Sequence, residues 1–212
     1  TLRMVKQLSA EILNENLEGA FACCDSVLDS LLQKNGSRLT PSLVQTYTRM
    51  MEKIVGNIIE FMGDGRKTQA HEIMGDVPEF TALPDMQLYA HMVLKELVRR
   101  ISAYKKSSQI AIVEKAKKYI AENYRKDIRL EAIAEHVSLS SYYLSRVFNK
   151  VEGIHLKDYL IKVRMEKAKN LLRQGNATIK QVSIDVGYPD PNYFSRAFKK
   201  YTQLSPKEYI NF

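Results

Sequence analysis

Apolar residues recur at intervals of three and four positions along most of this chain, and stretches that alternate between apolar and polar residues are lacking. This period predicts amphipathic helices and an all-α fold. In the first half, one helix is expected to end near Asn35–Gly36. A second helix begins with Thr40 as N-cap and Pro41 at its first position, and it stops at Gly63-Asp64-Gly65. A shorter helix over about 67–75 and a longer one over about 85–106 follow.

Capping residues divide the second half more clearly. Thr178 with Gln181, and Ser205 with Glu208, have the spacing of a capping box, and Gly175 stands where a helix C-terminus favours a left-handed residue. Seven helices are therefore expected in this half, over about 110–124, 130–137, 140–151, 155–173, 179–186, 190–201 and 205–211.

The net charge of +8 comes entirely from the second half. Residues 1–107 hold 13 Lys/Arg and 13 Asp/Glu, whereas residues 108–212 hold 19 Lys/Arg and 11 Asp/Glu, a difference of +8. The change falls at the polar stretch Lys105–Ser108, which we interpret as a hinge between a smaller helical domain (1–107) and a seven-helix domain (108–212). A basic domain favours a polyanion such as nucleic acid, although a solvated lysine-rich surface gives the same charge.

A short internal repeat organises the basic half. Residues 143–148 read Y-L-S-R-V-F and residues 193–198 read Y-F-S-R-A-F, an offset of fifty. Upstream the offset becomes 49, with Val137 facing Val186, so one residue has been added to the turn of the second copy. Each copy is a short helix, a tight turn and a second helix, which is the helix-turn-helix arrangement. Two copies joined by one long helix do not fit a solenoid, which needs three or more units.

The second helix of each copy has one apolar and one polar face when its residues are placed at 100° intervals. Leu144, Val147, Phe148 and Val151 fall inward, as do Phe194, Ala197, Phe198 and Tyr201, and we assign Tyr143 and Tyr193 to the packing side with them. The outward residues are Tyr142, Ser145, Arg146 and Asn149 in the first copy and Asn192, Ser195, Arg196 and Lys199 in the second. Arg can bond guanine N7 and O6 bidentately and Asn can bond adenine, so such faces suit a major groove of DNA.

The pattern I-x-x-V-x-x-x-V-G-Y-x-D-x-x-Y-F-S-R-x-F-K-K from Ile179 to Lys200, followed by S-P-x-x-Y from Ser205 to Tyr209, resembles the DNA-binding domain of AraC/XylS-type transcription activators. The resemblance covers residues 108–212. It implies two helix-turn-helix units that place their second helices in successive major-groove segments on one face of double-stranded DNA. The base contacts that it implies fall on Tyr142, Ser145, Arg146, Asn192, Ser195 and Arg196. The phosphate contacts that it implies fall on Lys150, Lys199, Lys200 and Arg164.

The chain departs from the family pattern at four positions. Ser138 replaces a turn glycine that the second copy keeps as Gly187, and Gln203 stands where Gly is common. Ser183 replaces a small Ala, and Arg129 replaces a Ser or Thr cap. These changes bear on the stability and pose of the first unit, and they leave the assignment intact.

The long helix expected over 155–173 would span about 28 Å at roughly 1.5 Å per residue. Successive major-groove segments on one side of DNA lie about 34 Å apart, so this helix is long enough to space two recognition helices by one turn. Because the two units differ in their outward residues, the DNA site need not be palindromic.

The neutral half gives weaker indications. The stretch from Glu15 to Asp29 loosely resembles the helical segment that precedes this domain in YesN-like response regulators. That resemblance implies coupling to a sensor or receiver domain upstream of Thr1, or dimerisation. A plain helical spacer is an alternative reading, and so is a small-molecule pocket lined by Tyr47, Met50, Met51, Phe61, Phe80 and Tyr89.

Other classes of protein find little support. The four histidines lack metal-ligand spacing, no Gly-rich phosphate loop occurs, and no cofactor is implied. Cys23 and Cys24 offer a nucleophile of the kind that some DNA-repair proteins join to such a domain, but we interpret both as buried packing residues. We therefore expect a regulator that is not an enzyme, acting in a reducing cytoplasm without a membrane anchor. Its partners would be DNA, RNA polymerase and a second copy of the chain, and a protein-only interaction module is the remaining alternative.

Overall fold

A computed structural model describes residues 2–63 and 69–211, and within those ranges the chain forms helices and connecting turns without any strand. It divides into two compact units, Thr1–Ser107 and Ser108–Phe212. The units are almost equal in length, so the first is not the smaller domain that we expected. Asp64 and Gly65, and the beginning of the helix expected over 67–75, lie outside the described residues.

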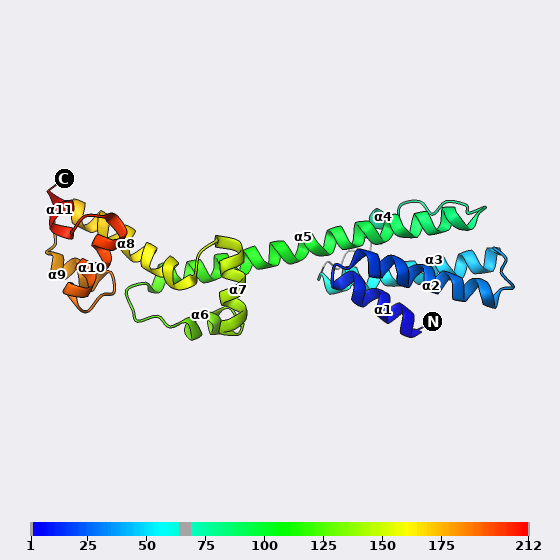
Figure 1. Cartoon of the computed structure of the whole chain (residues 1–212), viewed down its shortest axis with the longest axis horizontal. Helices are drawn as coiled ribbons and strands as arrows, with labels where there is room; N and C mark the ends of the chain where they lie inside the picture. Colours follow the sequence, from blue (N-terminus) through cyan, green and yellow to red (C-terminus); the bar gives the residue numbers. More distant parts are fainter. Residues whose placement is uncertain (1, 64–68, 212) are drawn as a thin grey trace. The chain divides into compact units, whose positions relative to one another are not determined.

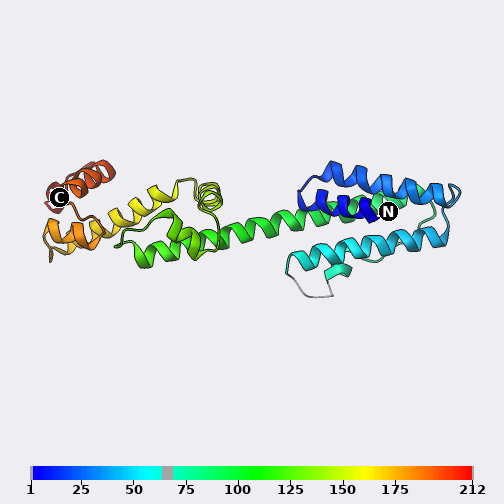
Figure 2. The ribbon, with the colours of Figure 1, turned by 90° about the horizontal axis from the view of Figure 1, so that it is seen from below.

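The first unit consists of α1 (Leu2–Leu13), α2 (Leu17–Lys34), α3 (Pro41–Phe61), α4 (Gln69–Met74) and the first part of α5 (Leu83–Asn123). The helices α1, α2 and α3 pack side by side (Figure 2). The expected cap of α3 is confirmed, because the Thr40 side chain accepts a hydrogen bond from the Leu43 N–H at 3.3 Å and Pro41 opens the helix.

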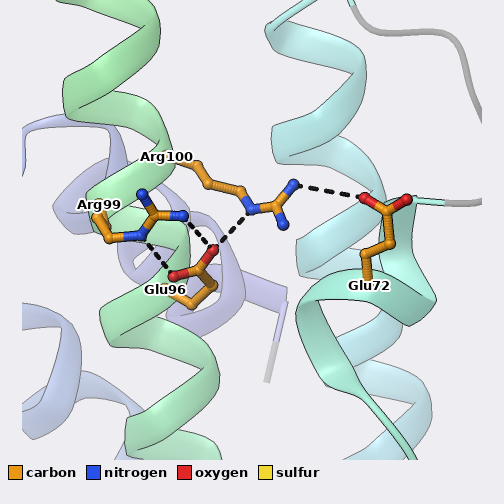
Figure 3. Close-up of polar contacts among 4 residues, drawn as sticks. All are labelled: Glu72, Glu96, Arg99 and Arg100. Atoms are coloured by element: carbon orange, nitrogen blue, oxygen red, sulfur yellow. Dashed lines mark hydrogen bonds and ion pairs between the residues drawn. The ribbon is translucent and has the colours of Figure 1, made fainter.

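One apolar core holds the first unit together, and α5 contributes Met86, Ala90, Leu94, Leu97 and Ile101 to it. A polar cluster supports the same helix at its surface. The carboxylate of Glu96 accepts hydrogen bonds from Arg99 and Arg100, and Arg100 also lies 3.8 Å from the carboxylate of Glu72 on α4 (Figure 3). This ion-pair network links α4 to α5.

The hinge that we expected at Lys105–Ser108 is wrong, because these residues lie inside the continuous helix α5. The two helices predicted over 85–106 and 110–124 are one helix, Leu83–Asn123. Neither Gly nor Pro occurs between Asp85 and Asn123, and Lys and Ser cost a helix only a few tenths of a kcal/mol per residue, roughly, so a polar stretch alone does not break it.

The second unit contains seven helices within its described residues: the last part of α5, then α6 (Leu130–His136), α7 (Ser141–Glu152), α8 (Leu156–Gln174), α9 (Ile179–Asp185), α10 (Pro191–Thr202) and α11 (Pro206–Ile210). Figure 1 shows α6 and α7 beside the end of α5, and α9, α10 and α11 around the end of α8. The capping box of Ser205 and Glu208 is complete, and Thr178 accepts from the Gln181 N–H.

Two apolar clusters form the core of this unit, one for each helix-turn-helix. Leu144 and Phe148 of α7 lie in the first cluster with Ile133 of α6, and Phe194 and Phe198 of α10 lie in the second with Val182 of α9. The linking helix α8 enters both clusters. Its residues in the first are Leu156, Tyr159, Leu160 and Val163, and its residues in the second are Ile161, Met165, Ala168, Leu171 and Leu172.

The two copies of the sequence repeat form the same structure, with equivalent hydrogen bonds in their caps and turns. Ser140 and Asp190 cap the second helices by accepting N–H hydrogen bonds. In the first turn the Leu139 N–H donates to the carbonyl of Ala134 at 2.9 Å, and in the second the Tyr188 N–H donates to the carbonyl of Ser183 at the same distance. Both are the 6→1 bond that closes a helix on a left-handed residue.

That left-handed residue is Ser138 in the first turn, with φ +57°, and Gly187 in the second, with φ +86°. Gln203, the position at which the resemblance in the sequence led us to expect Gly, also adopts a left-handed conformation, with φ +67°. A side chain with a β-carbon costs about 1 kcal/mol in this conformation, so these two departures reduce stability without changing the path of the chain.

Candidate DNA-binding surface

The first recognition helix, α7, presents its predicted base-contacting residues to solvent. Tyr142 is 73% exposed, Arg146 is exposed, and Ser145 is half-buried between them. The guanidinium of Arg146 lies 5.9 Å from the centre of the Tyr142 ring, within the range of a cation–π contact. Leu144 and Phe148 are fully buried beneath them, so the outward face is held in place by the core.

The second recognition helix, α10, repeats this arrangement fifty residues later. Asn192 and Arg196 are exposed and Ser195 is half-buried. The Ser195 hydroxyl donates to the carbonyl of Pro191 at 2.8 Å, so its oxygen is left as an acceptor for any further hydrogen bond. The guanidinium of Arg196 lies 6.0 Å from the ring of Tyr193. The positions of Arg146 and Arg196 thus correspond in the structure as they do in the sequence.

The assignment of Tyr143 and Tyr193 to the packing side is wrong. Tyr143 is 42% exposed and Tyr193 is 55% exposed, whereas the Leu and Phe that follow them are fully buried. Each tyrosine lies at the border between the two faces of its helix, about 100° from the buried residue that follows it. Tyr193 therefore belongs to the outward surface beside Arg196. Its recurrence in both copies could not show this, because the buried Phe148 and Phe198 recur in the same way.

Lysines extend the positive charge around these helices. Lys150, Lys199 and Lys200 are all exposed, as a contact to phosphate requires. Lys162 on α8 joins them without having been predicted. With Arg196 and Lys200 it lines a groove of about 620 Å³ between α8 and α10, in which Asp158 is the acidic residue.

Arg164 differs from the other predicted phosphate contacts because its guanidinium bonds to the protein itself. Its Nε donates to the carbonyl of Tyr124 at 2.8 Å, and its Nη2 donates to the carbonyl of Lys126 at 2.8 Å. The same group lies 5.2 Å from the centre of the Tyr188 ring. Arg164 is half-buried, and its guanidinium lies between the end of α5 and the turn of the second helix-turn-helix.

The two cysteines of the first unit are buried and lie in α2. The Cys24 sulfur lies 2.9 Å from the hydroxyl of Tyr47, and the Cys23 thiol donates to the carbonyl of Met4 at 3.3 Å. Burial raises the pKa of Cys24 to about 11, and burial also raises the pKa of Tyr47. Both groups are therefore neutral near pH 7.

The residues that we considered as the lining of a small-molecule pocket do not line one common pocket. Tyr47 and Met51 are fully buried in the core. Met50 and Phe61 line a groove of about 880 Å³ between α1 and α3, whereas Tyr89 lines a different one. Phe80 packs against Tyr89 at 5.4 Å between ring centres.

Within residues 2–63 and 69–211, no group of three or more His, Cys, Asp or Glu side chains is arranged to hold a metal ion. In the same ranges, no helix combines the length and the apolar character that crossing a membrane requires.

A family profile described as a helix-turn-helix domain matches residues 133–211, from within α6 to the end of α11. The Msm operon regulatory protein of Streptococcus mutans is 29% identical over 156 residues, or 68% of this chain and 56% of that protein. YijO of Escherichia coli K12, described as an uncharacterized HTH-type transcriptional regulator, is 38% identical over 99 residues, or 47% of this chain and 35% of the relative.

Among solved structures, the C-terminal domain of the two-component response regulator yesN from Fusobacterium nucleatum is 42% identical, with a TM-score of 0.45. The match covers 46% of this chain and 95% of that domain. The chain spans about a third to a little over half of the length of the curated relatives it matches. The doubled helix-turn-helix, the profile match and the similarity to these curated regulators show that the C-terminal half of the chain is a DNA-binding domain of the AraC family.

Proposed function

We propose that this chain reads one non-palindromic DNA site with two recognition helices and thereby activates transcription through RNA polymerase in the bacterial cytoplasm. In this proposal α7 and α10 enter successive major-groove segments on one face of the duplex. Tyr142, Ser145 and Arg146 contact bases from α7, and Asn192, Ser195 and Arg196 contact bases from α10. Lys150, Lys199 and Lys200 bind phosphates beside them.

The observation that carries the proposal is the equivalence of Arg146 and Arg196. Each is exposed, each stands on the second helix of a helix-turn-helix, and each lies over a tyrosine ring. A single arginine on a helix surface has many uses, but two arginines at equivalent positions of a repeated DNA-binding fold favour base contacts. Because Tyr142 in α7 corresponds to Asn192 in α10, the two helices would prefer different base pairs.

The groove between α8 and α10 supports the proposed placement of α10 in the major groove. Its cationic residues Lys162, Arg196 and Lys200 adjoin the reading face of α10. In our proposal the sugar–phosphate backbone between the two major-groove segments passes over this groove, so Lys162 adds a phosphate contact from the linking helix.

An enzyme that uses a cysteine is the alternative that the first unit allows. A nucleophilic cysteine needs an accessible thiolate, which a lowered pKa provides. Cys24 has the opposite environment, with no exposed surface and a pKa raised to about 11. We therefore infer a structural role for the cysteines and a regulator without enzymatic activity.

For the first unit we propose a coupling role between the DNA-binding unit and further domains of a longer regulator, with dimerisation as the second possibility. Its apolar core is built from α1 to α5 and does not depend on the second unit for its packing residues. A self-contained helical module of this kind is suited to change its association or its partners without unfolding the DNA-binding unit.

Selection of bound sequences from a random duplex library tests the proposal directly. The full chain is expected to enrich a site with two unlike half-sites about 10–10.5 base pairs apart, centre to centre. Its affinity is expected to fall steeply with salt, because each phosphate that the protein neutralises releases counterions. Enrichment of no sequence, or binding that does not respond to salt, would contradict the proposal and would favour a protein-interaction module.

A further inference from the structure

We propose that Arg164 is a positioning residue that fixes the distance and orientation between the two recognition helices. It does so as the centre of a joint formed by Tyr124, Lys126, Arg164, Gly187 and Tyr188. The inference rests on the proposed function, since it concerns how two helices engage one DNA site.

The joint connects the two halves of the DNA-binding unit at a second place besides the linking helix. Tyr124 belongs to the first apolar cluster and Tyr188 to the second. The guanidinium of Arg164 donates to backbone carbonyls beside the first cluster and lies 5.2 Å from the Tyr188 ring in the second. Two units attached to one helix can still bend and twist about it, so a second connection away from its axis restricts that motion.

The contacts of Arg164 need the shape of its side chain as well as its charge. Its two donors reach the carbonyls of Tyr124 and Lys126, each at 2.8 Å, which a planar guanidinium can satisfy at once. A lysine ammonium is a single compact charge and cannot bridge the two carbonyls while its stem lies against the Tyr188 ring. The need for two donors in a fixed plane distinguishes the structural role that we propose for Arg164 from a phosphate contact, which a lysine can also make.

Gly187 shows how closely the second turn approaches the end of α5. A β-carbon added at Gly187 would lie 2.7 Å from the carbonyl oxygen of Tyr124, 2.9 Å from that of Arg125 and 3.0 Å from Arg164 Nη2. The two carbonyls are backbone atoms that cannot turn aside. The joint therefore explains why the second turn keeps glycine, whereas the first turn accepts Ser138 at a similar φ.

Contacts between aromatic rings connect the joint to α10 and its exposed residues. The Tyr188 ring lies 5.8 Å from the rings of both Tyr193 and Phe194. Phe194 is fully buried under α10, and Tyr193 carries Arg196 over its face. The position of the end of α5 is thus linked through Arg164 and Tyr188 to the helix that holds Arg196.

The test compares Arg164→Lys with the unchanged chain on duplexes that carry the selected site with zero, one or two base pairs inserted between its half-sites. Losing a rigid connection lowers the effective concentration of the second helix at its half-site, so affinity for the unaltered spacing is expected to fall roughly tenfold. The penalty for inserted base pairs is expected to shrink, while affinity for random duplex changes less than about twofold. Thermal unfolding checks that the variant is folded.

Gly187→Ala is the second variant, because it disturbs the joint without changing any charge. It is expected to show the same relaxed spacing preference. Arg164→Ala completes the set, and its salt dependence is expected to match that of the unchanged chain, whereas loss of a phosphate contact lowers the slope by about one.

Two outcomes overturn the joint while leaving the proposed function in place. In one, Arg164→Lys binds every spacing as the unchanged chain does. In the other, Arg164→Ala lowers the salt slope by about one and keeps the spacing preference, which identifies a phosphate contact. Failure of the unchanged chain to select any DNA site instead overturns the proposed function, so the two failures are distinguishable.

Discussion

The guanidinium of Arg146 lies 5.9 Å from the centre of the Tyr142 ring, one helical turn earlier on α7. In α10 the position of Tyr142 is taken by Asn192, and Arg196 lies instead 6.0 Å from Tyr193, three residues earlier. Both spacings bring side chains together on a helix surface. The two arginines are therefore supported by different neighbours, although they occupy equivalent positions.

This support leads to a prediction for Tyr142. Tyr142→Ala removes the ring that orients Arg146, and an exposed cation–π contact contributes about 0.5–1 kcal/mol. Specific binding is expected to weaken roughly two- to fivefold, with discrimination lost at the base pair that Arg146 reads. Tyr142→Phe keeps the ring, and with it both the support of Arg146 and the apolar contact that we propose between this ring and the bases, so it is expected to bind normally. Competition binding with each single-base variant of the site measures this, and an equal loss in Tyr142→Phe would show that the hydroxyl contacts DNA instead.

Arg196 and Lys199 provide the sharpest contrast between base and phosphate contacts. Arg196→Ala is expected to cost about 1–3 kcal/mol of specific binding and to relax one base position. Lys199→Ala is expected to weaken specific and random duplex alike and to lower the salt slope by about one.

The control for both variants is Lys34→Ala, which removes an exposed lysine at the end of α2 in the first unit and so leaves the DNA-binding unit unchanged. It is expected to leave both affinities unchanged. Fluorescence anisotropy at several salt concentrations provides all three comparisons. Equal losses on specific and random duplex for Arg196→Ala would remove its role in reading sequence.

The helices could be predicted from the sequence because the signals for them are local. The apolar period and caps such as Thr40, Thr178 and Ser205 act within one or two turns, and the structure has a helix start at each of these caps. The hinge at Lys105–Ser108 failed because a change in charge is not a helix breaker. Local signals thus predict where helices begin and end better than composition does.

The outward arginines were also predictable, because helical phase assigns a residue to one face. Phase was least informative at Tyr143 and Tyr193, which stand at the border of their faces. The joint at Arg164 could not be predicted from the sequence, because its hydrogen-bond partners Tyr124 and Lys126 are about forty positions away along the chain. Only folding brings a cation on α8 to the carbonyls at the end of α5.

The ion-pair cluster of the first unit predicts how that unit responds to acid. Hydrogen bonds from Arg99 and then Arg100 lower the pKa of Glu96 to about 2. A carboxylate whose pKa is lowered by folding stabilises the folded state above its ordinary pKa, and the contribution is lost as pH falls from about 4.5 towards 2. Glu96→Gln is therefore expected to make unfolding less dependent on pH in this range.

Denaturant unfolding of the full chain at pH 2.5, 3.5, 4.5 and 7, followed by circular dichroism, measures that dependence. The matched control is Glu79→Gln, which changes an exposed glutamate in the loop before α5. It is expected to keep the pH dependence of the unchanged chain. An identical acid response in both variants would show that the Glu96 contacts with arginine are too screened by solvent to affect stability.

The pair formed by Cys24 and Tyr47 predicts the behaviour of the first unit in base. With a pKa of about 11, the Cys24 thiol stabilises the folded state fully below its ordinary pKa of 9.0, and this contribution is lost as pH rises through 11. The raised pKa of Tyr47 acts in the same direction. The free energy of unfolding is therefore expected to fall between pH 9 and pH 11, and to fall less steeply in Cys24→Ala.

The same pair predicts that Cys24 resists alkylation. Because the pKa of Cys24 is raised from 9.0 to about 11, the folded chain at pH 8 holds roughly 100-fold less Cys24 thiolate than the denatured chain. Burial also blocks the access of the reagent to the sulfur. A short pulse of iodoacetamide followed by mass spectrometry is expected to modify Cys24 only after denaturation. Modification at equal rates in the folded and denatured chain would mean that the thiol is accessible and ionised. That result would support a reactive cysteine. A thiolate near neutral pH needs an environment that lowers the pKa of the thiol, whereas burial beside Tyr47 raises it.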